Sequence, residues 1–214
     1  MESKSKKACF WEDEFEIEEG IFTPRPETEI LVESFVETGK FKPHTPFRFL
    51  DWGTGSGIIA VTIAKLFPHA EGAACDLSGQ ALAVSAKNAE RLGVKNRLQF
   101  VRSDGLSGFE KNSFDVIFSN PPYVASSEFA QLDPEVLCEP RLALDGGEEG
   151  TEFYKKIFSD LSSLKQNGSL WLEIGWNQRN ALEEIFHGSH FDEIRIFKDF
   201  NQMDRIIAGV GFNG

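Results

Sequence analysis

The sequence predicts an α/β fold built on a mostly parallel, doubly wound sheet. Short apolar runs typical of buried strands alternate with helical stretches along most of the chain. Several of these runs end at an aspartate or open into glycines, as strands do at a ligand-binding sheet edge. The length of 214 residues suits one such domain, and 41% hydrophobic residues provide for a core.

The first 20 residues are predicted to form an extension or hairpin ahead of the domain. Within 10–20, apolar residues such as Phe10, Phe15 and Ile17 alternate with acids, which indicates a strand or hairpin. We therefore divide the chain into an extension over 1–20 and a domain over 21–214.

The domain is predicted to begin with a helix after Thr23-Pro24-Arg25-Pro26. Pro26 fits the first turn of a helix, and Glu27 and Glu29 complement the helix dipole. Ile30, Leu31, Phe35 and Val36 are expected to give this helix its apolar face.

The remaining elements follow from the alternation of patterns. Strands are predicted over 47–50, 71–75, 98–101, 114–118, 169–174, 193–198 and 205–210, and helices over 56–67, 79–92, 151–164 and 178–187. No helix separates the last two strands, so we expect an antiparallel hairpin at the edge. The polar stretch over 124–150 has no periodicity, and long loops of this kind in compact domains are often functional.

Composition narrows the classes of function. A net charge of −12 and a pI near 4.8 disfavour nucleic acid as a partner, because an acidic surface repels phosphates. The three cysteines form no CxxC pair and the four histidines form no metal-binding spacing, so we expect no metal and a cytoplasmic protein with reduced thiols. No apolar run approaches the roughly 20 residues of a membrane helix. No signal peptide is visible, and we expect a monomer.

A glycine-rich turn follows the strand over 47–50. It reads Asp51, Trp52, Gly53, Thr54, Gly55, Ser56 and Gly57. Alternating glycines let backbone amides approach a ligand, although a bare glycine triplet also fits a tight turn without one. Position 58 is isoleucine, so the G-x-G-x-x-G spacing of dinucleotide-binding proteins is not met.

Acidic residues follow three of the predicted strands. Asp51 can pair with the ammonium group of a methionine moiety, whereas it would repel a pyrophosphate. Asp76, 19 residues after Gly57, can accept both hydroxyls of a ribose, which fits NAD as well as S-adenosylmethionine. Asp104, followed by Gly105, can accept an adenine amino group or belong to a solvated turn. Together the features favour S-adenosylmethionine.

The tetrapeptide Asn120-Pro121-Pro122-Tyr123 carries the predicted chemistry. An amide or aniline-type nitrogen is a poor nucleophile, and two acceptors for its hydrogens, the Asn120 side-chain oxygen and the Pro121 carbonyl, would hold it in line with a methyl group. Pro121 and Pro122 stiffen the loop, and Tyr123 can pack on a planar substrate. A proline-rich turn would explain the tripeptide alone, but its place after the fourth strand favours a catalytic site.

The chain closely resembles the HemK/PrmC family of release-factor glutamine N5-methyltransferases over nearly its whole length. The matching motifs are Thr23-Pro24-Arg25-Pro26-Glu27-Thr28-Glu29, residues 51–57, Asn120–Tyr123, Glu139-Pro140-Arg141-Leu142-Ala143-Leu144 with Gly146-Gly147, and Glu173-Ile174-Gly175 with Gln178.

The resemblance implies a seven-stranded, Rossmann-like class I methyltransferase fold with helices on both faces of the sheet. It implies that S-adenosylmethionine is bound by Thr28, Asp51, Gly53, Thr54, Gly55, Ser56, Gly57, Asp76, Asp104, Gly105 and Asn120. It implies that Asn120, Pro121, Pro122 and Tyr123 hold the substrate glutamine, which in the family is that of the GGQ loop of release factors.

Three features depart from the family pattern. Family members usually carry an N-terminal helical domain that docks the release factor, and we expect this chain to lack it. Trp52 stands where leucine is usual and is expected to pack beneath the glycine loop. Gly105 stands where a large apolar residue is common, which predicts a thinner wall beside the adenine.

Other functions stay open. The same tetrapeptide serves methyltransferases of adenine N6 and cytosine N4, so a nucleic acid is an alternative substrate, as is another protein such as a ribosomal protein. A degenerate binding module without activity is a third reading, although the expected cofactor and catalytic side chains are all present.

Overall fold

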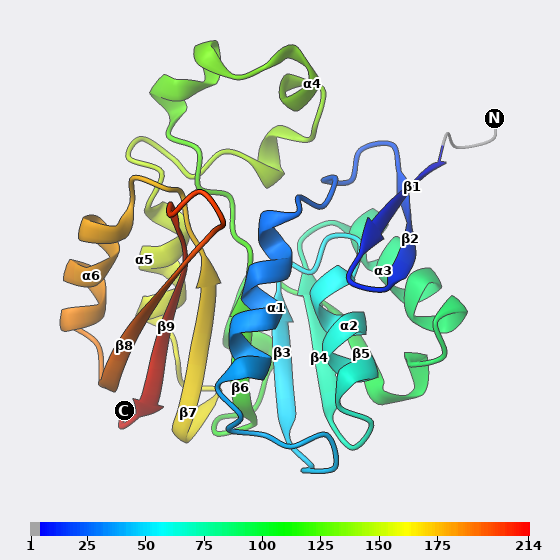
Figure 1. Ribbon diagram of the computed structural model, residues 1–214, viewed down its shortest axis with the longest axis vertical. Coiled ribbons are helices and arrows are strands. Elements are labelled where there is room, and N and C mark those ends of the chain that lie inside the picture. Colours follow the sequence, from blue (N-terminus) through cyan, green and yellow to red (C-terminus); the bar gives the residue numbers. More distant parts are fainter. Residues whose placement is uncertain (1–4) are drawn as a thin grey trace.

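The computed structural model describes residues 5–214, so the first four residues of the predicted extension lie outside it. A seven-stranded sheet carries helices on both faces (Figure 1). Its strands are β3 (Arg48–Trp52), β4 (Glu71–Asp76), β5 (Leu98–Arg102), β6 (Phe114–Ser119), β7 (Leu164–Glu173), β8 (Phe191–Lys198) and β9 (Asp204–Phe212). The order across the sheet is β5-β4-β3-β6-β7-β9-β8. The predicted fold class is confirmed.

The helices are α1 (Glu27–Glu37), α2 (Ile58–Leu66), α3 (Gly79–Arg91), α4 (Pro134–Leu137), α5 (Glu152–Ser159) and α6 (Arg179–His187). In the described part of the chain, none is long and apolar enough to cross a membrane. The predicted helix over 151–164 is too long, because the Asp160 carboxylate accepts from the Ser162 amide at 3.1 Å and turns the chain toward β7.

Two hydrophobic layers lie on opposite faces of the sheet. Neighbouring residues of one strand contribute to different layers: Phe49 packs with α1, α2 and α3, whereas Leu50 packs with α5 and α6. Phe118 and Ile117 of β6 divide in the same way. The central strands are therefore buried on both faces, which explains why they appear in the sequence as continuous apolar runs.

The sheet reverses its winding direction between β3 and β6. Along the chain, β4 and β5 lie on one side of β3, and the later strands lie beyond β6. β3 and β6 are parallel neighbours, and the Ser119 hydroxyl donates to the Trp52 carbonyl at 2.7 Å where both strands end. Ligands bind at such a switch point in open α/β sheets, outside the carboxyl ends of the strands. The glycine turn follows β3 at this point, and Asn120 follows β6 there.

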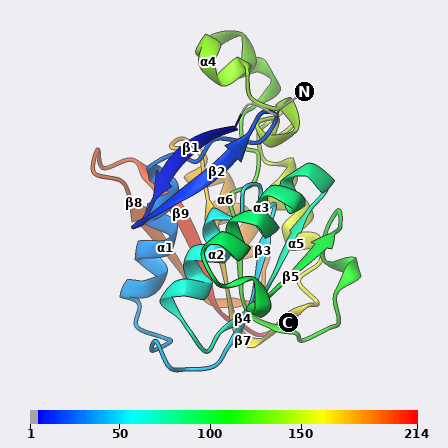
Figure 2. The same cartoon turned by 90° about the vertical axis from the view of Figure 1, so that its right-hand side faces the viewer.

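The N-terminal segment is a hairpin of β1 (Ser5–Phe10) and β2 (Asp13–Glu18). Figure 2 shows it lying across the helices that cover one face of the sheet. Phe10, Phe15 and Ile17 are buried in the layer formed with α1, α2 and α3. The Asn88 side chain of α3 accepts from the Glu16 amide and donates to the Glu16 carbonyl, both at 2.9 Å. The hairpin is thus packed into the domain.

Helix α1 has the predicted position, with Pro26 immediately before its first residue. Ile30, Leu31 and Phe35 are buried, but Val36 is exposed, so its assignment to the apolar face is wrong. The helical period turns position 36 away from the sheet, toward solvent.

We call residues 124–150 the cap loop, because they rise above the carboxyl edge of the sheet (Figure 1). The predicted loop contains α4 and the short 3-10 helices Ser126–Gln131 and Arg141–Ala143. Its two ends are tied together, since the Val124 amide donates to the Leu144 carbonyl and the Gly146 amide donates to the Val124 carbonyl, both at 2.9 Å.

Candidate active site

A cavity of about 390 Å³ lies at the switch point of the sheet. Its walls come from the glycine turn, the ends of β4 and β6, the cap loop and the segment before α1. The volume lies in the range of pockets that hold cofactors and small ligands. The cavity brings together the predicted site residues Gly53, Thr54, Gly55, Ser56, Asp76, Asp104, Asn120, Pro121, Pro122 and Tyr123.

The glycine turn presents bare backbone to this cavity. Gly53 and Gly55 have positive φ angles of 75° and 54°, and a Cβ at either position would meet no protein atom within 4 Å. A ligand can therefore approach the backbone closely at both places. Gly57 serves packing instead, because a Cβ there would lie 2.3 Å from Ser85 Oγ of α3.

Asp51 lies beneath the glycine turn and is fully buried, off the cavity wall. Its Oδ2 accepts from the Thr54 hydroxyl at 2.6 Å and from the Ala60 amide at 3.1 Å, which fixes the turn to the start of α2. No described residue donates to Oδ1. Burial raises the pKa of the Asp51 carboxyl to about 7, although both hydrogen bonds oppose the rise.

Asp76 borders the cavity at the end of β4. Its Oδ2 accepts from the Gly55 amide at 3.0 Å and its Oδ1 accepts from the Ser78 amide at 2.8 Å. Each carboxylate oxygen has a further lone pair, so this fixed group can also accept from two ligand hydroxyls.

Beside the cavity, the large side chain of Trp52 occupies space that the absent side chain of Gly105 leaves open. Gly105 does not line it, and its φ of 145° and missing side chain leave room for the Trp52 ring, 3.5 Å from where a Gly105 Cβ would lie. Trp52 is buried and does line the cavity. Its indole therefore replaces the apolar wall that the glycine lacks. Asp104 also lines the cavity and is ion-paired with Lys156.

The Asn120 side chain has one orientation because of Thr28. The Thr28 hydroxyl donates to Glu173 Oε2 at 2.7 Å, so toward Asn120 it can only accept. It accepts from Asn120 Nδ2 at 3.1 Å. The amide nitrogen thus faces Thr28, and Oδ1 is the end left for the cavity. Thr28 itself is buried off the cavity wall, behind Asn120.

Glu173, at the end of β7, joins Asn120 to Tyr123. Its second carboxylate oxygen accepts from the Tyr123 hydroxyl at 3.4 Å. Burial raises the pKa of Glu173 to about 7, against the lowering effects of the Thr28 hydrogen bond and of Arg205. Burial also raises the pKa of Tyr123, so this phenol stays protonated and donates.

Gln178 fixes the backbone on the other side of Tyr123. Its Nε2 donates to the Tyr123 carbonyl at 2.9 Å and to the Gly150 carbonyl at 3.0 Å, and its Oε1 accepts from the Gly175 amide at 2.9 Å. Tyr123 is therefore held through both its hydroxyl and its carbonyl.

The sequence analysis named Glu173 in a family motif and Trp52 beneath the glycine turn, but it assigned neither residue a role in the site. Glu173 ends an apolar strand, as the acids at the ends of other strands do, and this was the available signal. Among residues 5–214, no three His, Cys, Asp or Glu side chains gather as metal ligands would.

Comparison with known proteins shows which family the chain belongs to. The methyltransferase small domain family matches residues 19–149. The chain is 38% identical to the release factor glutamine methyltransferase of Caulobacter vibrioides over 94% of its length and 70% of that protein. It is 40% identical to that of Cereibacter sphaeroides, over 93% and 70% of the two chains. The chain belongs to the release factor glutamine methyltransferase family.

Solved structures agree on the fold of this family member. The N-terminal domain of human METTL16 in complex with SAH superposes with a TM-score of 0.62 at 17% identity, over 90% of this chain and 73% of that one. As a release factor glutamine methyltransferase family member, the chain is a methyltransferase whose cofactor is S-adenosylmethionine, as predicted.

The residues present fit this cofactor. The open space beside Gly53 and Gly55 admits a ligand against the backbone, and Asp76 offers a fixed acceptor next to it. The Trp52 ring lines the cavity with an apolar surface, which suits a planar group.

Proposed function

We propose that this chain methylates the side-chain amide nitrogen of a glutamine in a release factor. The observation that carries the proposal is the fixed orientation of Asn120, whose Oδ1 is left for the cavity beside the Pro121 carbonyl. Curated relatives that are 38–40% identical to the chain over the aligned residues are named release factor glutamine methyltransferases.

The two acceptors address the weakness of an amide as a nucleophile. Its lone pair is delocalised into the carbonyl, so attack requires an exact position and stabilisation of growing positive charge. Asn120 Oδ1 and the Pro121 carbonyl each accept one N–H of the substrate amide and aim its nitrogen at the methyl group. Both acceptors are preorganised, one by Thr28 and the other by the proline pair.

Bound S-adenosylmethionine supplies an electrophilic methyl group. The cofactor would transfer that methyl group to the amide nitrogen and leave as its thioether, and the nitrogen would lose one proton to solvent. The methylated nitrogen is strongly acidic until it loses that proton, so the site requires no general base. Tyr123 packs against the planar amide, and its hydroxyl is directed away from the amide, toward Glu173.

We assign the cofactor-binding residues in two groups. Gly53, Thr54, Gly55, Ser56, Asp76, Asp104 and Asn120 border the cavity and would contact the cofactor directly. Thr28, Asp51, Gly57 and Gly105 lie behind the wall and would act through the groups that they hold or the space that they leave.

The second candidate substrate is an exocyclic amine of a nucleic acid, as in adenine N6 methylation. The same two acceptors suit that nitrogen. Charge favours a protein: the cap loop beside the cavity contains seven acids and one arginine, in a chain of net charge −12. The chain would act in the cytoplasm, as a monomer, on a release factor or, as the alternative protein substrate, a ribosomal protein.

Mass spectrometry tests this function. Purified chain, S-adenosylmethionine and an unmodified release factor are incubated, and the release factor is digested and mapped. We expect one added methyl group on the GGQ glutamine, and none with Asn120→Ala. Methyl transfer to RNA or DNA in parallel reactions, without transfer to the release factor, would overturn the assignment in favour of the second candidate.

A further inference from the structure

Large exposed apolar side chains gather at one edge of the sheet. In the described part of the chain they are Val36, Leu77, Leu137, Leu142, Trp176, Phe200 and Met203. All except Val36 lie in the turns and loops at the carboxyl edge, where the cavity opens (Figure 1). Contiguous patches of exposed apolar side chains on soluble proteins mark interaction sites.

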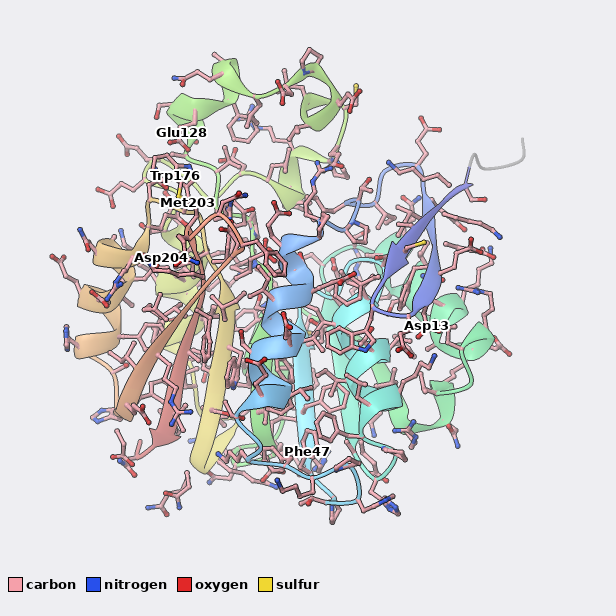
Figure 3. The ribbon with its side chains drawn as sticks, in the orientation of Figure 1. Asp13, Phe47, Glu128, Trp176, Met203 and Asp204 are labelled. Atoms are coloured by element: carbon pink, nitrogen blue, oxygen red, sulfur yellow. The ribbon has the colours of Figure 1, made fainter. Side chains whose placement is uncertain are left out.

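Three of these residues lie in the two turns at the ends of β7 and β9, and we call them the hairpin patch: Trp176, Phe200 and Met203. The β7–β9 register pairs Glu173 with Ile206, and the Ile174 amide continues it by donating to the Arg205 carbonyl at 2.8 Å. Trp176 follows Ile174 by two residues and Met203 precedes Arg205 by two, so both lie in the turns where β7 ends and β9 begins. Figure 3 labels both residues at the upper end of these strands.

The turn that carries Phe200 is firmly built. The Asp199 carboxylate, itself buried, accepts from the Asn201 amide at 2.8 Å, the Met203 amide at 2.9 Å and Arg205 Nε at 2.9 Å. Phe200 is nevertheless 94% exposed. An ordered turn therefore holds a phenylalanine in solvent, where it contributes nothing to folding of the domain.

The hairpin patch is coupled to the catalytic wall. Trp176 follows Gly175, whose amide donates to Gln178 Oε1, and Gln178 Nε2 donates to the Tyr123 carbonyl. A protein whose glutamine enters the cavity at Tyr123 would have its surrounding surface at the edge of the sheet where the patch also lies.

Charge restricts the partner further. Three arginines of this edge are neutralised within the chain: Arg205 by Asp199, Arg179 by Glu183, and Arg141 by Asp145. By contrast, Glu128 and Glu148 of the cap loop form no ion pair with any described residue. These unpaired carboxylates of the loop that borders the cavity favour a basic surface on a partner that reaches the cavity.

We propose that the hairpin patch docks the body of the protein substrate, through a basic surface that carries apolar side chains and surrounds the methylated glutamine. This inference rests on the proposed function. Exposed Trp, Phe and Met are the residue types that dominate protein interfaces, and their position fits a substrate larger than the cavity.

The test compares a whole release factor with a short peptide around its glutamine. The double variant Trp176→Ser/Phe200→Ser removes the patch, and Val36→Ser removes an equally apolar exposed residue away from the edge. For the whole release factor we expect kcat/KM of the double variant to fall about tenfold or more, through KM. With the peptide, and with Val36→Ser on either substrate, values should stay within about twofold of the wild type.

Different outcomes of this experiment would contradict the docking proposal and the proposed function. An equal kcat/KM of double variant and wild type on the whole release factor would overturn the docking face, as would an equal loss on the peptide. A wild-type dimer that the double variant converts to monomer, in analytical ultracentrifugation, would assign the patch to a second copy instead. If the wild type methylates neither substrate, the proposed function itself fails.

Discussion

Asn120 donates its side-chain amide hydrogen to Thr28, 92 residues earlier in the chain, at 3.1 Å. Thr28 in turn donates to Glu173 at 2.7 Å. Three elements distant in sequence thus determine which end of one amide reaches the cavity, and the orientation of Asn120 depends on a hydroxyl that does not line it.

Thr28→Val is expected to lower kcat about 10- to 100-fold. Valine has a similar shape but cannot accept from Asn120 or donate to Glu173, so the amide loses its orientation and Glu173 loses a buried partner. Binding of S-adenosylmethionine, measured by calorimetry, should change much less than kcat. Thr28→Ser keeps the hydroxyl and should retain most activity; if serine fails as severely as valine, the hydroxyl is not what matters.

Asp51 and Glu173 are expected to make the free energy of unfolding depend on pH. Their contribution should fall as pH rises from about 4 to about 7. Burial raises both pKa values in the folded chain to about 7, so the native state holds protons that the unfolded chain releases in that interval. This contribution is complete below the unfolded pKa values and is lost as pH passes about 7. Urea denaturation of wild type and Asp51→Asn/Glu173→Gln at pH 5 and pH 8 measures it. The variant should show the smaller loss of stability between the two pH values.

Asp76→Ala should weaken S-adenosylmethionine binding about 10- to 100-fold. The variant removes the acceptor for a ligand hydroxyl and also the acceptor for the Gly55 and Ser78 amides; a charged hydrogen bond contributes about 1.5–3 kcal/mol. Isothermal titration calorimetry gives the Kd directly. Asp133→Ala, an exposed acid of the cap loop off the cavity wall, is the control and should bind as the wild type does.

Gly150→Ala should lower both stability and kcat. Gly150 has a φ of 72°, and a Cβ there would lie 2.5 Å from the Tyr123 carbonyl oxygen and 2.7 Å from Gln178 Nε2. Gly93→Ala is the matched control, because its φ of 76° is similar but a Cβ would meet nothing within 4 Å. Gly93→Ala should cost about 1 kcal/mol of backbone strain and leave kcat unchanged. Equal effects of the two variants on kcat would contradict a role for Gly150 in placing Tyr123.

The sequence was sufficient for the alternating elements and for the residues at strand ends. Asp76 and Asn120 reach the cavity because parallel strands bring their carboxyl ends to one edge, which local pattern can predict. The sequence was insufficient where the role of a residue depends on contacts with residues far away in the chain. Thr28 meets Glu173 across 145 residues, and no periodicity within α1 or β7 records that pairing. Val36 was misplaced because an apolar residue at a helix end satisfies the pattern whether or not a partner covers it.

The exchange of bulk between Trp52 and Gly105 has a consequence for the history of this chain. The positive φ at 105 favours glycine, and a Cβ there would lie 3.5 Å from the indole, so a longer side chain would compete with the indole for space. A smaller residue at 52 alone would remove part of the cavity wall. A larger residue at 105 alone would take the space that the indole occupies. Along an evolutionary lineage the two sites should therefore substitute as a pair, with a large residue at 105 accompanied by a smaller one at 52. A chain that had lost its methyl donor would be released from that constraint, and the pairing would decay.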